Sequence, residues 1–226
     1  MDWKRFFIDR CPPSAYYIPN FLTLQEEKLI LSMIVKTPKP RWTQLSNRRL
    51  INYGGVPHPK GMITEEIPTW LQSIVGKVNQ LNEVFDGERE ANHVLVNEYL
   101  AGQGIMPHSD GPLFHPTITT VSCGSHAVLE FHEPYNDGEV NCPQKRQPVA
   151  KLLVQPRSLL VLKDDLYHKY LHSIAEFTED TIDESIANLT SEDVNVRLGD
   201  IMERGTRISL TIRHVPKTSK VKIKLR

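Results

Sequence analysis

The chain has 226 residues, and its 27 lysines and arginines are balanced by 27 aspartates and glutamates, so the formal net charge is zero. No global field would therefore steer the whole molecule towards a polyanion. Three scattered cysteines argue against a disulfide framework and favour a reducing compartment. Because no stretch has the apolar length of a secretory signal or a membrane span, we expect a soluble, intracellular protein. We also expect it to be a monomer that is found in the cytoplasm and nucleus.

The elements predicted before residue 90 are mainly helices. The first 20 residues or so, rich in proline and aromatic residues, should be extended. Thr23-Leu-Gln-Glu26 has the pattern of a capping box, and the apolar helical stripe that follows it ends at Thr37-Pro-Lys-Pro. Glycines and prolines between Arg41 and Met62 predict a loop or an irregular hairpin. A second helix is predicted from about Pro68 to about Leu81.

From His93 onward the sequence changes to the two-residue period of β-strands. Short strands divided by glycine and proline turns indicate an all-β sandwich or barrel, and a jelly roll is one such fold. The segment from Glu176 to Glu203 has nine acids and one base, and we interpret it as a surface insertion that is partly disordered. The predicted strands are His93–Leu100, Thr117–Cys123, Ala127–His132, Lys151–Val154, Ser158–Leu162, Tyr170–Ile174 and Thr206–Val215.

The run His108-Ser-Asp110 is the first candidate for a metal site. Residues two apart in an extended segment point to the same side, so this imidazole and carboxylate would converge. They would make two-thirds of the 2-His-1-carboxylate triad that holds non-heme Fe(II) and leaves positions open. The alternative is a pair of surface polar residues before a Gly-Pro turn.

A third ligand would have to be a histidine further along the chain. His172 has the best strand context, and His168 is second. His126 and His132 lie closer in sequence, and spacing does not exclude them. A lone histidine is, however, more often a satisfied polar residue than a ligand.

The strand Arg207-Ile-Ser-Leu-Thr-Ile-Arg213 carries two arginines and two hydroxyls on one side and aliphatic residues on the other. Inward arginines would be costly to bury without an anion, so they face either solvent or a site that contains acids. An arginine can pair bidentately with a carboxylate, which lysine cannot imitate. On an earlier strand, Asn97 and Tyr99 share a face and could hydrogen-bond a dicarboxylate, unless they are an ordinary cross-strand pair.

The segment from Lys36 to Lys60 has six basic residues and no acid. Cations with interleaved aromatic residues suit phosphate contact and base stacking, and a solvated loop with the tryptophan anchored in the core is the alternative. The tail after Pro216 is basic as well, and the acidic segment could mask the basic one by opposite charge. The candidate substrate-binding residues are Trp42, Arg48, Arg49 and Tyr53.

Taken in order, these motifs closely resemble the AlkB family of Fe(II)- and 2-oxoglutarate-dependent dioxygenases. The resemblance extends to Pro40-Arg-Trp-Thr-Gln-Leu-Ser, Asn52-Tyr-Gly-Gly and Gly104-Ile-Met-Pro-His-Ser-Asp-Gly-Pro112. It covers nearly the whole chain except the acidic segment and the tail. The motifs that carry it are Asn97-x-Tyr99, His108-x-Asp110, His172 and Arg207-x-Ser209-x-Thr211-x-Arg213.

The resemblance implies a mainly β fold, with a double-stranded β-helix (jelly-roll) core, flanking N-terminal helices and a nucleotide-recognition lid between about Lys39 and Lys60. A single dioxygenase domain would fill residues 1–226, with the helices and lid in 1–90, the core in 91–215 with the acidic insertion at about 176–203, and the basic tail in 216–226. The implied cofactors are Fe(II), 2-oxoglutarate and dioxygen. The implied ligands are His108, Asp110 and His172 for iron, and Asn97, Tyr99 and Arg207 for 2-oxoglutarate, with Ser209 and Arg213 beside them.

The function that we expect from this resemblance is oxidative demethylation of alkylated nucleic acid, RNA rather than DNA, on a base that is single-stranded or flipped out. Three alternatives stay open. The chain could be a nucleic-acid-binding module with a vestigial iron site, a dioxygenase that acts on protein, or a jelly-roll metal protein that does not use 2-oxoglutarate.

Overall fold

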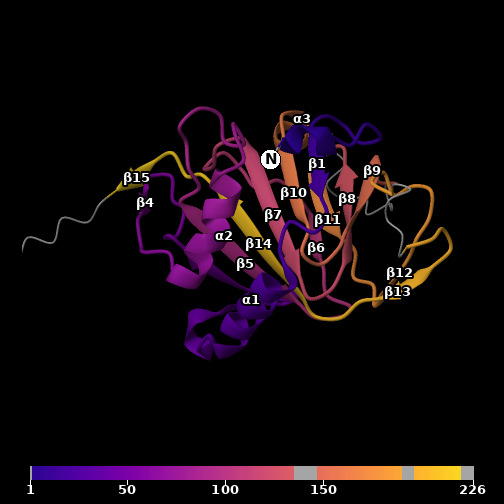
Figure 1. The fold of residues 1–226 in the computed structure, drawn as a ribbon, viewed down its shortest axis with the longest axis horizontal. Helices are drawn as coiled ribbons and strands as arrows, with labels where there is room; N and C mark the ends of the chain where they lie inside the picture. Colours follow the sequence, from indigo (N-terminus) through magenta and orange to yellow (C-terminus); the bar gives the residue numbers. More distant parts are fainter. Residues whose placement is uncertain (1, 135–146, 190–195, 220–226) are drawn as a thin grey trace, which may run out of the picture.

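The computed structural model describes residues 2–134, 147–189 and 196–219. Two antiparallel sheets face each other, and the helices lie beside the larger one (Figure 1). The larger sheet has the order β1 (Ala15–Ile18), β10 (Leu159–Lys163), β7 (Thr117–Cys123), β14 (Arg207–Arg213), β5 (His93–Tyr99), β3 (Arg48–Tyr53) and β2 (Thr43–Leu45). The smaller sheet has the order β6 (Ile105–His108), β11 (Leu171–Ile174), β8 (Ala127–His132) and β9 (Ala150–Val154).

The path of the chain between the sheets confirms the predicted jelly roll. Strands β5, β6, β7 and β8 fall alternately in the larger and smaller sheets, and β9, β10, β11 and β14 return in the same alternating manner. Two four-stranded layers result, with β3, β2 and β1 added at the edges of the larger layer. Every pairing within the two sheets is antiparallel, so each strand presents alternate residues to the space between the layers.

Both predicted helices are confirmed. α1 (Leu24–Lys36) begins with the capping box, in which Thr23 accepts from the backbone N–H of Glu26 and the Glu26 carboxylate accepts from that of Thr23. α2 (Thr69–Asn79) follows Pro68. The helices pack on the even-numbered residues of β5 and β14, such as Val96 and Leu210, which are fully buried. Because side chains alternate along a strand, the odd-numbered residues face the smaller sheet.

The segment predicted as a loop or irregular hairpin contains a regular strand. β2 and β3 form a hairpin, and β3 pairs with β5 as part of the larger sheet. The flanking glycines and prolines hid this strand, because Gly54 and Gly55 follow it directly, and both have positive φ. Further on, β4 (Met62–Ile63) pairs in parallel with β15 (Thr218–Ser219). The N-terminal residues include a 3₁₀ turn, η1 (Trp3–Phe6), and another, η2 (Lys39–Arg41), precedes β2.

The acidic segment was expected to be a surface insertion that is partly disordered, and its described parts are packed against the smaller sheet. β12 (Glu179–Thr181) and β13 (Ile201–Glu203) form a hairpin. Ile182 and Ile186 are buried in a small core with Val128 and Leu153 of the smaller sheet. Residues 190–195 and the tail beyond Ser219 lie outside the described residues, as do 135–146. In the described chain, no helix is long and apolar enough to cross a membrane.

Candidate active site

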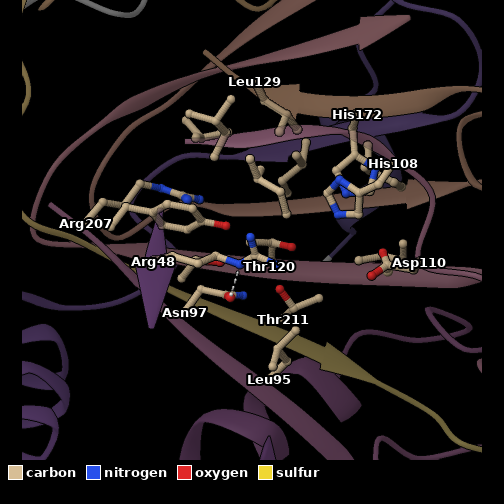
Figure 2. Close-up of a pocket in the computed structure, with 18 of the residues that line it drawn as sticks. Arg48, Leu95, Asn97, His108, Asp110, Thr120, Leu129, His172, Arg207 and Thr211 are labelled. Carbon is tan, nitrogen blue, oxygen red and sulfur yellow. Dashed lines mark hydrogen bonds between the residues drawn. The ribbon is translucent and has the colours of Figure 1, made fainter. Parts of the chain in front are cut away.

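A cavity of about 210 Å³ lies between the two sheets (Figure 2). The odd-numbered residues of β5 and β14 form its polar wall, and aliphatic side chains of the smaller sheet, β7 and β10 close the rest. Figure 2 shows the two imidazoles together at one end and Arg207 at the other. The cavity thus gathers eight residues from the candidates of the sequence analysis: Arg48, Asn97, Tyr99, His108, Asp110, His172, Arg207 and Ser209.

The two histidines are brought together by strand pairing. His108 on β6 is the direct cross-strand partner of His172 on β11, and their ring centroids are 4.3 Å apart. Nδ1 of His108 lies 2.9 Å from the carbonyl oxygen of Met106. A proton on that nitrogen would be donated to the carbonyl, leaving the lone pair of Nε2 free. Burial lowers the pKa of His172 to about 4, against the attraction of Asp110, so this ring is neutral at pH 7 and can act as a ligand.

Asp110 follows β6 and is held through one of its two oxygens. Arg213 Nη1 donates to Oδ1 at 2.6 Å, and the guanidinium lies 3.7 Å above the ring of Phe114. The other oxygen, Oδ2, is buried and has no hydrogen-bond partner among the described residues. In the described chain, no three His, Cys, Asp or Glu side chains already enclose one cation position, because the carboxylate is turned towards Arg213. The donor set of two imidazoles and one carboxylate with a free buried oxygen nevertheless fits Fe(II).

At the far end of the cavity, Arg207 is buried and has no counter-ion among the described residues. Its Nη2 donates to Ser122 Oγ at 2.9 Å, its guanidinium carbon lies 5.7 Å from the ring centre of Tyr99, and its Nε has no partner among the described residues. Burial lowers the pKa of the guanidinium, because the charged form is desolvated. A carboxylate ligand would relieve this cost, so the cavity fits a dicarboxylate that reaches from Arg207 towards the histidines.

The polar wall between the two ends comes from two neighbouring strands. Asn97 on β5 lies opposite Ser209 on β14, and Tyr99 lies opposite Arg207. These residues are therefore cross-strand pairs, and they also face the cavity. Burial raises the pKa of the Tyr99 phenol, although the positive charges of Arg207 and Arg48 oppose this shift, so the phenol stays protonated and can donate a hydrogen bond.

The comparisons with known proteins agree with this geometry. The sequence pattern of the 2OG-Fe(II) oxygenase superfamily matches residues 14–213. The chain belongs to this superfamily. It is 48% identical over 219 residues to a Danio rerio protein named "Probable RNA/DNA demethylase ALKBH6", covering 96% of this chain and 92% of the relative, which confirms the AlkB resemblance. It is also 28% identical over 206 residues to a protein named L905 of Acanthamoeba polyphaga mimivirus, covering 88% and 84%.

A solved structure described as "The structure of OsALKBH1" shares the fold, with a TM-score of 0.56 at 16% identity over 90% of this chain and 99% of that one. As a member of the 2OG-Fe(II) oxygenase superfamily, the chain is an oxidoreductase of the dioxygenase type. Its cofactors are therefore Fe(II) and 2-oxoglutarate, with dioxygen as the oxidant.

The other histidines considered as iron ligands lie outside the cavity. His132 is on the outer face of the smaller sheet, where Nε2 is 2.8 Å from Ser173 Oγ. His126 is buried 3.1 Å from Asp180, beneath the acidic segment. His168 is exposed at the end of α3 (Asp165–His168), a short helix that the sequence did not predict. Among the four, only His172 faces the cavity.

Three of the four candidate substrate-binding residues divide between the two faces of β3, and the fourth, Trp42, follows η2. Arg48 lines the cavity, and its Nε donates to Asn97 Oδ1 at 3.2 Å. Arg49 faces the other way, pairs with both oxygens of Glu98 and lies 4.1 Å above the ring of Trp42. Tyr53 is buried in the core beside the helices. Of the four, the structure brings only Arg48 into the cavity.

Three contacts of the site were not anticipated from the sequence. Ser122 supports Arg207, the carbonyl oxygen of Met106 orients His108, and Phe114 lies under Arg213. Ser122 shares one face of its strand with Thr120, but Thr117 and Thr119 place hydroxyls on the other face as well, so the sequence did not single out Ser122. The Met106 contact is made by a backbone carbonyl and the Phe114 contact by a loop residue, so no sequence pattern predicted either of them.

Proposed function

We propose that this dioxygenase is an oxidative demethylase of alkylated nucleic acid and that RNA is preferred over DNA. The observation that carries the proposal is one cavity with two imidazoles at one end, beside a carboxylate that has one oxygen without a hydrogen-bond partner, and a buried arginine at the other end with no carboxylate partner among the described residues. The order of the AlkB-type motifs, and the likeness to a fish protein named as a probable RNA/DNA demethylase, support nucleic acid as the substrate class.

We assign His108, Asp110 and His172 as the ligands of Fe(II). We assign Arg207 to the distal carboxylate of 2-oxoglutarate, with Asn97 and Tyr99 as its hydrogen-bonding wall. When bound, the iron and its co-substrate supply the oxidation: dioxygen and 2-oxoglutarate give succinate and carbon dioxide, and one oxygen atom enters an N-methyl group that leaves as formaldehyde.

The protein's own residues would orient these groups and keep water out. Arg213 neutralises one oxygen of Asp110 and leaves the other for the metal. The carbonyl oxygen of Met106 fixes the tautomer of His108. The aliphatic lining, which includes Leu129 and Leu160, excludes solvent from the cavity. Because the cavity lies between two sheets, a base in a duplex would have to leave the stack to reach it.

The first test is anaerobic titration of the Fe(II) protein with 2-oxoglutarate, following the metal-to-ligand charge-transfer band. We expect a band in the wild type and weaker co-substrate binding in Arg207→Ala. Formaldehyde release from N-methylated RNA and DNA oligonucleotides of the same sequence then shows which of the two polymers is the preferred substrate. If iron binds but no band forms, the proposal is wrong, and the chain is a jelly-roll metal protein that does not use 2-oxoglutarate.

Two further outcomes would redirect it. If Asp110→Ala binds RNA as the wild type does, and the wild type never releases formaldehyde from any modified base, the chain is a nucleic-acid-binding module. If the charge-transfer band forms and 2-oxoglutarate is consumed only with a protein substrate, the enzyme is a protein-directed dioxygenase.

A further inference from the structure

The strands of the larger sheet carry four arginines, which fall into two pairs. Arg49 and Arg213 each contact a carboxylate, from Glu98 and Asp110 respectively. Within the described chain, Arg48 and Arg207 have no carboxylate within ion-pair distance, and both line the cavity between the sheets. The one acid that lines this cavity, Asp110, pairs with Arg213, so the two other guanidiniums favour an anionic ligand.

The two unpaired arginines approach the same part of β5 from opposite sides. Strand β5 lies between β3 and β14. On one side, Arg207 is the cross-strand partner of Tyr99. On the other side, Arg49 lies opposite Glu98, so Arg48, one residue earlier on the antiparallel strand, lies beside Tyr99. Figure 2 shows Arg48 entering the cavity near the end that Arg207 occupies.

The side-chain contacts of Arg48 agree with this placement. Its Nε donates to Asn97 Oδ1 at 3.2 Å, which holds the guanidinium against the polar wall. Both Arg48 and Arg207 are close enough to Tyr99 for their charges to lower the pKa of its phenol, against the larger effect of burial. Arg48 is only half-buried, so bringing its charge to this position costs less than burying Arg207.

We propose that Arg48 is a second cation for the distal carboxylate of 2-oxoglutarate, so that the carboxylate lies between Arg207 of β14 and Arg48 of β3. The inference rests on the proposed function, because it assumes that 2-oxoglutarate fills this cavity with its distal end at Arg207. It moves Arg48 from the expected contact with nucleic acid to a contact with the co-substrate.

A consequence is that the co-substrate ties the β2–β3 hairpin to the core. The hairpin is at the edge of the larger sheet and joins it through β3 alone. A carboxylate shared by Arg48 and Arg207 would add a bridge from this hairpin to β14, so the hairpin would be ordered by co-substrate before nucleic acid arrives.

The test compares two ligands and two neighbouring arginines. The ligands are 2-oxoglutarate and 2-oxopentanoate, which has the same chain length but lacks the distal carboxylate. The variants are Arg48→Ala and, as the matched control on the opposite face of β3, Arg49→Ala, each checked for a native melting transition. Affinities come from the charge-transfer band of the anaerobic Fe(II) protein.

We expect Arg48→Ala to weaken 2-oxoglutarate about tenfold, the effect of one partly exposed charge-assisted hydrogen bond, and to leave 2-oxopentanoate within about twofold of wild type. Arg49→Ala should change neither ligand. Deuterium exchange in residues 43–53 should slow on adding 2-oxoglutarate to the wild type but not to Arg48→Ala. Unchanged 2-oxoglutarate affinity in Arg48→Ala overturns the inference, and so does an equal loss for both ligands.

Failure of the proposed function would look different. The wild type would then give no band with 2-oxoglutarate, and the variants would not need to be compared. If instead the wild-type band forms, and Arg48→Ala weakens only the binding of RNA, the co-substrate role is wrong and Arg48 belongs to the nucleic-acid surface.

Discussion

The two arginines at the ends of β14 should respond differently when their charges are removed from the ligand-free protein. Arg213 and Asp110 form a nearly buried pair, with 4% and 10% of their side chains exposed and 2.6 Å between Nη1 and Oδ1. Arg213→Met would leave the Asp110 carboxylate buried without its partner. Breaking a buried pair in this way costs about 3–5 kcal/mol of the free energy of unfolding.

Arg207 is as buried as Arg213 but has no carboxylate partner in the described chain. Arg207→Met removes a hydrogen bond to Ser122 worth about 1 kcal/mol and a contact with the Tyr99 ring worth about as much. The variant also removes the desolvation penalty of an unpaired ion, which is several kcal/mol. The free energy of unfolding should therefore fall by no more than about 1 kcal/mol, or rise.

Urea unfolding of the metal-free protein at pH 7.5, with wild type and both variants, measures the difference. A loss of about 3 kcal/mol in Arg207→Met, equal to that in Arg213→Met, would refute the reasoning, since it would mean that Arg207 already has a strong partner. Repeating the series with Fe(II) and 2-oxoglutarate at about 100 times the wild-type Kd should stabilise the wild type by about 2.7 kcal/mol and Arg207→Met by much less.

Three further predictions concern other parts of the molecule. Burial, helped by the charge of Arg213, lowers the pKa of His93 from 6.5 to about 3, so the stability that the neutral ring contributes above pH 6.5 is lost as the pH falls towards 3. When urea unfolding is measured at pH 7.5 and at pH 4.5, the free energy of unfolding should fall by about 2–3 kcal/mol less in His93→Asn than in the wild type. His172→Ala should weaken Mn(II) binding at least about tenfold by calorimetry, whereas His168→Ala should not, and equal losses would remove His172 from the site. Ile182→Ala should cost about 2–4 kcal/mol because Ile182 is buried, and a cost below about 0.5 kcal/mol would mean that the acidic segment is not packed.

The catalytic half of the fold was predictable because its strands have two chemically distinct faces. Strand β14 alternates aliphatic residues that meet the helices with polar residues on the opposite face. That pattern placed both arginines on one face, but it left open whether the face met solvent or a site. The strands over residues 117–123 and 127–132 have the bounds that the sequence predicts. Strand β6 was missing from the predicted strands, although it carries His108, because it has four residues and includes a proline.

For the segment expected to form the lid, the sequence did not predict on which face each side chain lies. A basic segment with aromatic residues favours nucleic-acid contact as a whole, but it does not say on which face each residue lies. Arg48 and Arg49 are adjacent, so a regular strand sends one into the cavity and the other to Glu98 on the helix side. Interpreting the segment as a loop or an irregular hairpin gave no regular alternation, and therefore no means to separate the two arginines.

The acidic segment shows where composition misleads. Its nine acids suggested solvation, yet two isoleucines four residues apart, Ile182 and Ile186, fill a core against the smaller sheet. The acids between and before them are not free either. Asp180 accepts two hydrogen bonds from Arg204, and Asp183 lies 3.9 Å from Lys151. Two of the nine acids therefore help to attach the segment to the core.

This attachment limits how the acidic segment could mask the basic lid and how masking could be tested. Removing the segment would delete Ile182 and Ile186 and expose Val128 and Leu153, against which they pack, so a deletion would measure folding before it measured masking. Between the described parts of the segment and the lid, the structure has one side-chain hydrogen bond, from Asn47 at the β2–β3 turn to the Glu176 carboxylate. Because this turn comes directly before Arg48, any effect of the segment on the β2–β3 hairpin through this contact would act at the end of the cavity that Arg48 and Arg207 line.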